Sequence, residues 1–296
     1  MMTDDPERYL AFLVRARSVL YQSDDITAHI LMLMVSFALQ FYKDRPSSSR
    51  KASFMRALIA NLFITTPSIS DPVMRFHFSL RALYLSLLAN SRPQTEALLH
   101  YSLQTMNDLD VPPSQCLSLY SEFLALLVFV PDKSKEHVLV IFDGFVKVIQ
   151  RKKWPPNSEA VLGDVWILCM RYLWAVSRQE FSIKFTNVQS NDVFHGSSKE
   201  YITAVMEKVD FVMQQLLSLI ETQSPAKPTV ALHLLEFAVM RLEIKGAVVK
   251  LVSNLLKRCA RSGVFEARVR CIIDDLIKLS ESNEEVKEAL IKMKLL

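Results

Sequence analysis

Apolar residues recur at a spacing of three or four along most of the chain, which is the period of an amphipathic helix. One such stripe near the C-terminus consists of Phe265, Val269, Ile272, Ile273 and Leu276. Residues 165–170 are apolar on all sides, so we expect neighbours to cover this helix from several directions. Runs rich in Val, Ile and Phe, such as 123–130, keep the helical spacing and are therefore interpreted as helix rather than strand.

Proline and short polar residues divide the chain into separate helices. Asp71 followed by Pro72 is the pattern of an N-cap and a first helical residue. Ser91 and Gln94 have the spacing of a capping box. A further helix is expected over residues 132–153. Breaks of this kind define about thirteen helices in total.

Taken in pairs, these helices form hairpins over residues 4–43, 50–90, 93–130, 133–178, 198–243 and 245–281. The repeat of roughly 40 residues is in the range of HEAT-type hairpins. A last helix over 284–294 has a single apolar stripe, as a capping helix needs. The predicted fold class is therefore all-α, a HEAT-like α-solenoid of about six helical hairpins plus a C-terminal capping helix.

Residues 1–296 are expected to form a single α-solenoid. Its predicted parts are the first hairpins over 4–178, an irregular loop over 179–197, and C-terminal hairpins with the capping helix over 198–296. The first helix has less polar coverage than the others, so we expect a longer protein to continue on its N-terminal side.

Composition supports the helical interpretation. Half of the 296 residues are hydrophobic, 22% are charged and only 5 are glycine. Such an apolar chain is not disordered. Glycine is well below its usual share of about 7%, and Rossmann, P-loop and β-sandwich folds normally need more of it for turns and phosphate loops.

The charge balance and the N-terminus limit the kinds of partner. The net charge of +4 is spread over 35 basic and 31 acidic residues, which is too weak a basic footprint to predict nucleic-acid binding. The start of the chain lacks the pattern of a signal peptide. The longest uncharged run, 26–42, is shorter than the ~20 residues of a bilayer span, so we expect no direct membrane insertion.

No residue pattern predicts catalysis or a cofactor. The four cysteines contain no C-x-x-C pair and mostly lie in apolar runs, which favours reduced, buried thiols over zinc or disulfides. Nucleophile-elbow, phosphate-loop and zincin motifs are absent, and the six histidines are scattered. We therefore predict a non-enzymatic protein with no catalytic, cofactor-binding or metal-binding residues.

Two clusters are candidate contact sites. Residues 151–154, Arg-Lys-Lys-Trp, place Trp154 beside cations, a combination enriched at interfaces. The alternative is that these cations only complement a helix dipole. The irregular loop 181–197 contains the turn residues Asn191 and Asp192, and a loop of this length between tight helices is either functional or an ordinary connector.

From Leu126 to Tyr201 the sequence resembles the C-terminal part of the large α-solenoid subunits of the retriever and retromer family. The matching features are Val130-Pro131-Asp132, Phe142-Asp143-Gly144-Phe145 ahead of Trp154, Ser190-Asn191-Asp192, and Gly196 with Ser198-Lys199 opening the next helix. Retromer has a His-Gly-Gly-Lys stretch at this helix start. The stretch His195-Gly196-Ser197-Ser198-Lys199 departs from it by one inserted residue and one lost glycine.

The resemblance implies a scaffold of an endosomal cargo-recycling complex, cytoplasmic and held peripherally on endosomes by its partners. It also implies that the solenoid grips a small metallophosphoesterase-fold subunit, whose pocket His195 faces. Further subunits would bind through a preceding N-terminal part. The residues expected to bind the partner are His195, Asn191, Asp192 and Trp154.

Two other classes stay open from the residues alone. A generic HEAT-type adaptor for peptide segments would show a ladder of Asn, Trp or acidic residues repeated along one groove. The three tryptophans Trp154, Trp166 and Trp174 instead lie within one predicted hairpin. An all-α enzyme would need titratable residues that converge in a closed pocket.

Overall fold

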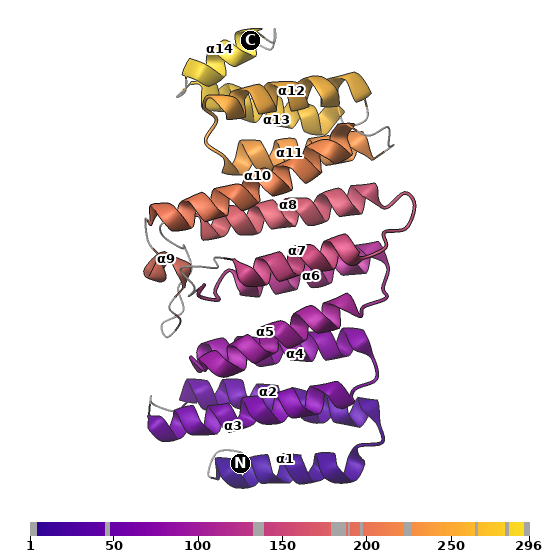
Figure 1. Ribbon diagram of the computed structural model, residues 1–296, viewed down its shortest axis with the longest axis vertical. Coiled ribbons are helices and arrows are strands. Elements are labelled where there is room, and N and C mark those ends of the chain that lie inside the picture. The colour runs from indigo at the N-terminus through magenta and orange to yellow at the C-terminus, as the bar shows by residue number, and fades with distance from the viewer. Residues whose placement is uncertain are drawn as a thin grey trace. The chain divides into compact units, whose positions relative to one another are not determined.

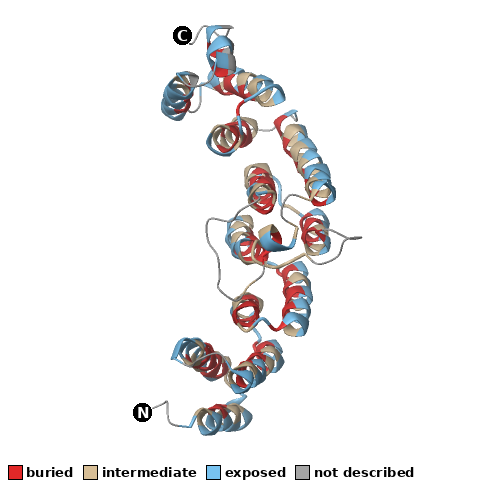
Figure 2. Cartoon of the chain, turned by 90° about the vertical axis from the view of Figure 1, so that its left-hand side faces the viewer, coloured by how far each residue is buried: buried red, intermediate tan, exposed pale blue. Residues whose placement is uncertain are grey.

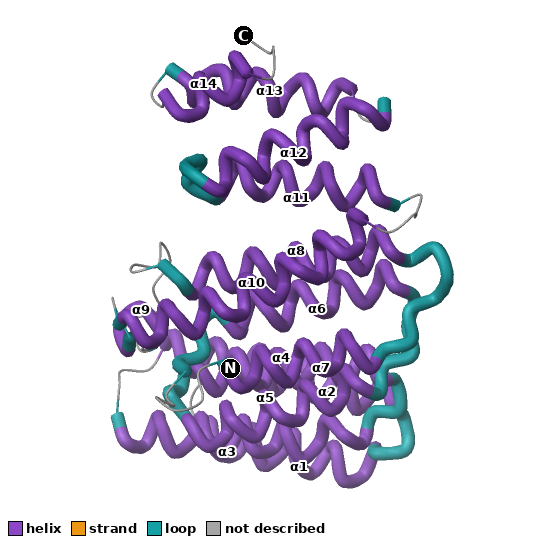
Figure 3. Tube along the Cα trace, turned by 45° about the horizontal axis from the view of Figure 1, so that its top comes forward, coloured by secondary structure: helices purple, strands orange, loops and turns teal. Residues whose placement is uncertain are grey.

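The chain folds into α-helices that pack side by side. The computed structural model describes residues 5–44, 48–132, 139–178, 188, 190–195, 198–221, 226–263, 266–281 and 284–292. These residues contain 14 α-helices, one short 3-10 helix and no strand (Figures 1 and 3). The predicted all-α solenoid class is therefore confirmed.

The helices belong to two compact units. The first comprises residues 1–111, 125–153 and 179–197, and the second comprises 112–124, 154–178 and 198–296. Helix α6, Pro113–Leu127, has most of its residues in the second unit. Figure 2 shows that the helices turn their buried sides toward their neighbours and their exposed sides outward.

The first unit stacks its helices in chain order. Its elements are α1 (Pro6–Leu20), α2 (Asp24–Asp44), α3 (Ser49–Thr65), the 3-10 helix η1 (Thr66–Ser68), α4 (Pro72–Leu88), α5 (Arg92–Asn107), α7 (Val140–Arg151) and α9 (Asn191–Phe194). Helix α2 contacts α1, α3 and α4, and α5 contacts α3, α4 and α7. The predicted hairpins over 4–43 and 50–90 therefore form.

The second unit is built in the same way. Besides α6 its helices are α8 (Glu159–Val176), α10 (Lys199–Glu221), α11 (Lys227–Arg241), α12 (Ala247–Ser262), α13 (Glu266–Ser280) and α14 (Glu284–Lys292). Helix α8 contacts both α10 and α11, and α14 contacts α12 and α13. The predicted covering of the all-apolar stretch 165–170 is confirmed, since Val165, Cys169 and Met170 are buried.

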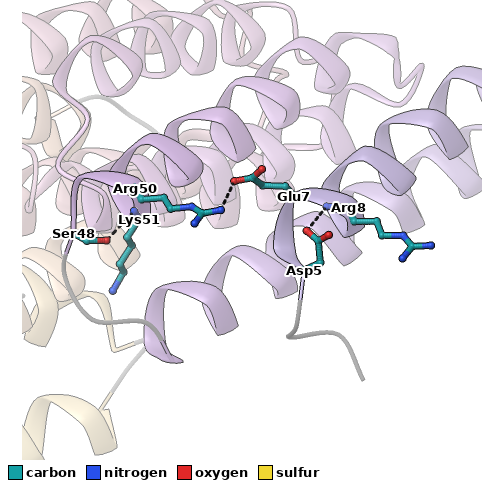
Figure 4. Close-up of polar contacts among 6 residues, drawn as sticks. All are labelled: Asp5, Glu7, Arg8, Ser48, Arg50 and Lys51. Atoms are coloured by element: carbon teal, nitrogen blue, oxygen red, sulfur yellow. Dashed lines mark hydrogen bonds and ion pairs between the residues drawn. The ribbon is translucent and has the colours of Figure 1, made fainter.

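Side-chain caps fix several helix starts. The Asp5 carboxylate accepts from the backbone N–H of Arg8, and the Ser48 hydroxyl accepts from that of Lys51 (Figure 4). Asp71 caps α4 as the sequence predicts. Each of these bonds satisfies a backbone donor that the first turn of a helix leaves without a partner.

The predicted capping box at Ser91 is wrong. Ser91 is the N-cap of α5, but its side chain makes no capping hydrogen bond. The Gln94 side chain instead donates to the backbone carbonyl of Arg56 on α3, at 2.8 Å. A bond to a neighbouring helix replaces the local one, and spacing along the chain alone could not indicate this.

Polar contacts join α1 to α3. The Arg50 guanidinium lies 2.9 Å from the Glu7 carboxylate (Figure 4), and Arg17 donates to the Thr65 hydroxyl. Because Glu7 and Arg50 are both largely exposed, their ion pair adds little stability. Burial of Leu10 and Leu13 is the stronger contribution to holding α1 in place.

Helix α2 is long and apolar enough to cross a membrane, by length and composition, and it is the one helix of this kind in the described part of the chain. It packs against three other helices and buries Ile30, Leu31, Met34 and Phe37 among them. This is the pattern of a core helix in a helical array.

Two details near the predicted loop differ from expectation. Residues 191–194 form α9, a short helix that the sequence did not predict. Helix α7 begins at Val140 rather than at 132, directly after Leu139, whose φ is +63°. Residues 133–138, and 179–187, 189 and 196–197 of the predicted irregular loop, lie outside the described part of the chain.

Candidate partner-binding site

Two of the predicted site residues bind the same residue of another segment. Asn191 is 1% exposed, and its side-chain carbonyl accepts from the backbone N–H of Asp132 at 2.6 Å. The His195 imidazole bonds through Nε2 to the backbone carbonyl of Asp132. Because a carbonyl oxygen can only accept, Nε2 carries the proton. Asn191 and His195 thus fasten α9 to the segment before α7.

The Asp132 carboxylate completes this polar clamp, which we define as Asp132, Asn191 and His195. It accepts from the backbone N–H of Leu139. Burial raises the pKa of the Asp132 carboxyl, while the Leu139 N–H and the nearby His195 lower it and Asp143 raises it further. The sequence interpretation treated Asp132 only as a helix start, although Val130-Pro131-Asp132 was part of the family resemblance.

The other two predicted residues have different settings. Asp192 is half-buried in the only turn of α9 and accepts from the Ser190 hydroxyl. Trp154 is half-buried and belongs to the second unit. The structure therefore brings Asn191, Asp192 and His195 together within the first unit, with Trp154 in the other.

The cations before Trp154 have a structural role. Arg151 lies in the last turn of α7, where a positive charge complements the helix dipole. The Lys152 ammonium donates to the backbone carbonyl of Leu109, at 3.4 Å. The position of Arg151 supports the helix-end interpretation, and the Lys152 bond ties the end of α7 to the segment after α5.

The outer side of α9 is apolar. Val193 is 62% exposed and Phe194 is 39% exposed. The Arg92 guanidinium of α5 lies 5.9 Å from the centre of the Phe194 ring, and a small cleft beneath this ring is lined by residues of α4 and α5 and by Pro131. Sequence reasoning missed Val193 and Phe194, although they are adjacent apolar residues that directly follow Asn191 and Asp192.

The described residues around α9 form no metal-binding set. In the described ranges no group of three or more His, Cys, Asp or Glu residues could hold an ion. Cys116, Cys169 and Cys259 are buried as predicted, and Cys271 is exposed. Burial, with the charge of Glu236, raises the pKa of the Cys259 thiol to about 11, so this sulfur stays protonated. What α9 offers is an apolar surface on a polar clamp, which suits contact with another protein.

Comparison with known proteins identifies the family of this chain. A sequence model of the VPS35L C-terminal domain matches residues 2–295. The zebrafish protein "VPS35 endosomal protein-sorting factor-like" is 25% identical over 72% of this chain and 23% of its own length. The human protein of that name is 24% identical over 74% of this chain and 24% of its own length.

The fruit-fly relative, "VPS35 endosomal protein sorting factor-like", is 24% identical over 97% of this chain and 31% of its own length. The chain thus spans 23% to 31% of the length of these relatives. The family match covers both units and confirms the resemblance inferred from residues 126–201. The chain belongs to the VPS35L C-terminal domain family.

Proposed function

We propose that this chain is the C-terminal part of a non-enzymatic scaffold for endosomal protein sorting. Its family membership carries this proposal, because relatives matching most of the chain are named endosomal protein-sorting factor-like. Stacked helices with extended exposed surfaces suit a scaffold, since each hairpin presents side chains to a partner. The protein would work in the cytoplasm, held at endosomes by its partners.

A finer proposal concerns the partner, a small metallophosphoesterase-fold subunit of a retriever-like complex. We infer that α9 is part of the surface that grips it. The observation that carries this is the exposed pair Val193 and Phe194, presented on a helix that Asn191 and His195 fix to Asp132. A preorganised apolar anchor loses little conformational entropy when it binds.

In this proposal His195 and Asn191 act mainly as positioning residues. The bond of His195 Nε2 to Asp132 occupies that nitrogen, so the atom reaches a partner pocket only if the clamp opens. Asp192, half-buried beside them, holds Ser190 at the start of α9. Trp154 would be a separate contact from the second unit.

Calorimetric titration of this chain with the small subunit tests the apolar contact. Val193→Ser with Phe194→Ser should weaken binding by about tenfold or more, as loss of an interface anchor does. Ile64→Ser, which changes an exposed apolar residue of α3, is the matched control and should leave affinity unchanged. Equal affinity of the double variant and the parent would contradict the use of α9.

A second titration tests the clamp. His195→Ala combined with Asp192→Ala should weaken binding, because α9 loses one of its two bonds to Asp132 and the bond between Asp192 and Ser190. The same variant should show faster amide exchange in α9, a signal that the loss of a contact alone would not produce. Unchanged affinity would exclude the clamp from the interface.

A pull-down from cytosol separates this proposal from a generic peptide adaptor. Recovery of the phosphoesterase-fold subunit supports the retriever-like scaffold. Recovery of assorted cargo peptides without that subunit supports the adaptor.

A further inference from the structure

The second unit contains a polar groove of about 550 Å³ that the proposed function does not use. Residues of α6, α8, α11 and α13 line it, among them Ser118, Asp164, Arg171, Glu236 and Arg268. Of its acidic residues Asp164, Glu236 and Glu122, the first two each lie against a basic side chain. The His233 ring lies 2.5 Å from the Asp164 carboxylate, and the Arg268 guanidinium lies 2.6 Å from that of Glu236.

Arg171 is the cation of this groove without an acidic partner in the described part of the chain. It is exposed on α8. Trp174 lies one turn further along α8, on the same side as Arg171, and Arg178 follows after the helix ends at Val176. Beyond Arg171, the end of α8 therefore offers an aromatic ring and then a second exposed cation.

Two arginine guanidinium groups lie over the Trp174 indole ring. The Arg178 group lies 4.8 Å from its ring centroid, and the Arg241 group of α11 lies 5.1 Å away. No carboxylate pairs with either arginine among the described residues, and the Glu243 carboxylate near Arg241 pairs with Lys245. Helices α8 and α11 contact each other within the second unit, and Trp174 and Arg241 lie near their C-terminal ends.

Helix dipoles explain only part of this arrangement. A cation at the C-terminal end of α8 or α11 is favourable there. That effect does not account for Arg171 in the body of α8, nor for two guanidiniums on one indole ring. Two guanidiniums on one ring without a carboxylate partner among the described residues repel each other, and an anion that binds both relieves this repulsion.

The residue types are those of an interface. Arginine, tryptophan and methionine are enriched in interface cores, and Met240, next to Arg241, is 73% exposed. A guanidinium stacked on an aromatic ring keeps its N–H edge available for a carboxylate in bidentate geometry. We propose that Arg171, Trp174, Arg178 and Arg241 form a docking surface for an acidic segment of a partner protein.

This docking surface is independent of α9 and can be tested without the small subunit. The probe is a fluorescein-labelled peptide of alternating glutamate and leucine, titrated into the full chain and followed by fluorescence anisotropy. Arg171→Gln, Arg178→Gln and Arg241→Gln together should weaken binding at least about tenfold, since charge-assisted bidentate bonds are lost.

A matched control removes the same charge elsewhere in the unit. Lys250→Gln, Lys257→Gln and Arg261→Gln change exposed cations of α12 and should alter affinity less than about twofold, as surface charges do. Trp174→Leu leaves the net charge unchanged and should also weaken binding, because the platform for two guanidiniums is gone. All variants should keep the parental helical circular dichroism.

Three results would overturn the proposal. One is the absence of saturable peptide binding. Another is an equal loss in both triple variants, which would show only diffuse attraction to a basic protein. The third is binding to vesicles containing phosphatidylserine, lost in the Arg171 triple variant, with no binding of the peptide, which would assign the cations to a membrane surface.

Discussion

At the residue scale, Asp132 uses each of its polar groups in the native state. Its N–H donates to Asn191, its backbone carbonyl accepts from His195, and its carboxylate accepts from Leu139. The same burial that makes these bonds strong also penalises the negative charge. The raised pKa of the Asp132 carboxyl shows that the penalty exceeds the stabilisation.

The raised pKa predicts a pH dependence. In the folded state the Asp132 carboxyl holds its proton above the ordinary value of 3.8, so the folded state binds more protons than the unfolded state in this window. Stability therefore falls as pH rises above the ordinary pKa of about 4. Asp132→Asn removes this titration, and its melting temperature relative to the parent should rise over the same range.

The measurement is thermal unfolding of the parent and Asp132→Asn at several pH values. The two proteins should differ least near pH 4 and most near neutrality. A difference that stays constant with pH, or that shrinks as pH rises, would mean that the carboxylate form is the favoured one.

The sequence predicted some of this site but not its connections. Asn191 and Asp192 were found because turn-forming residues gather in one loop, and His195 through the family resemblance. Their partner Asp132 lies 59 positions from Asn191 and 63 from His195. No local pattern predicts hydrogen bonds between residues so far apart in the sequence. The exposure of Phe194 depends on these bonds, because they fix the position of α9.

At the element scale, α4 and α5 share buried hydroxyl groups. Ser79 and Ser102 lie 3.0 Å apart, and Ser86 and Thr95 lie 2.9 Å apart. The Ser79 hydroxyl donates to the carbonyl of Phe76, so in the shared bond Ser102 is the donor. Each helix thus satisfies a polar group of the other inside an apolar contact.

Removing one partner of a pair should cost more than removing both. Ser79→Ala leaves the buried Ser102 hydroxyl without its acceptor and should lower the free energy of unfolding by about 1–3 kcal/mol. In a double-mutant cycle measured with urea, Ser102→Ala should be less costly in the Ser79→Ala background. Strictly additive losses would show that the two hydroxyls are not coupled.

Helices α8 and α11 pack closely at one glycine. A Cβ at Gly163 would lie 2.5 Å from Val230 Cγ2, and a β-branched side chain cannot swing away. Overpacking of about 1–3 kcal/mol should outweigh the gain of up to about 1 kcal/mol in helix propensity. Gly163→Ala should therefore lower the denaturant midpoint.

Two further variants make this prediction specific. Gly144→Ala meets only the end of the flexible Leu103 side chain and should be nearly neutral. In a Val230→Ala background, Gly163→Ala should lose most of its cost, because the clashing methyl groups are gone. A loss of equal size in both backgrounds would rule out the Val230 contact as its cause.

Helix boundaries follow from the sequence wherever a local signal exists. Asp71 with Pro72 starts α4 as predicted, because both the cap and the fixed φ act within one turn. Helix α9 was missed since four residues are too few to show a period. Ser91 was misread because the bond of Gln94 to α3 replaces the capping box.

At the scale of the whole molecule, contacts are mostly between helices that are close in chain order. In the first unit α3 and α4 contact each other and both α2 and α5, and in the second α8, α10 and α11 contact one another. The stability of stacked helical hairpins is approximately a sum of local terms. A destabilising substitution should therefore loosen its own unit first.

Native-state amide exchange can measure this locality. Gly163→Ala should speed exchange in α8, α10 and α11 and leave the amides of α2 to α5 as in the parent, because the strained contact with Val230 lies within the second unit. Ser79→Ala should do the reverse, since Ser102 lies in the first unit. If either substitution accelerated amide exchange to the same degree in both units, this would show that the two units unfold as one cooperative body. A change at the candidate partner surface of α8 would then affect the surface of α9, and the reverse. Binding at one surface would alter the binding affinity of the other.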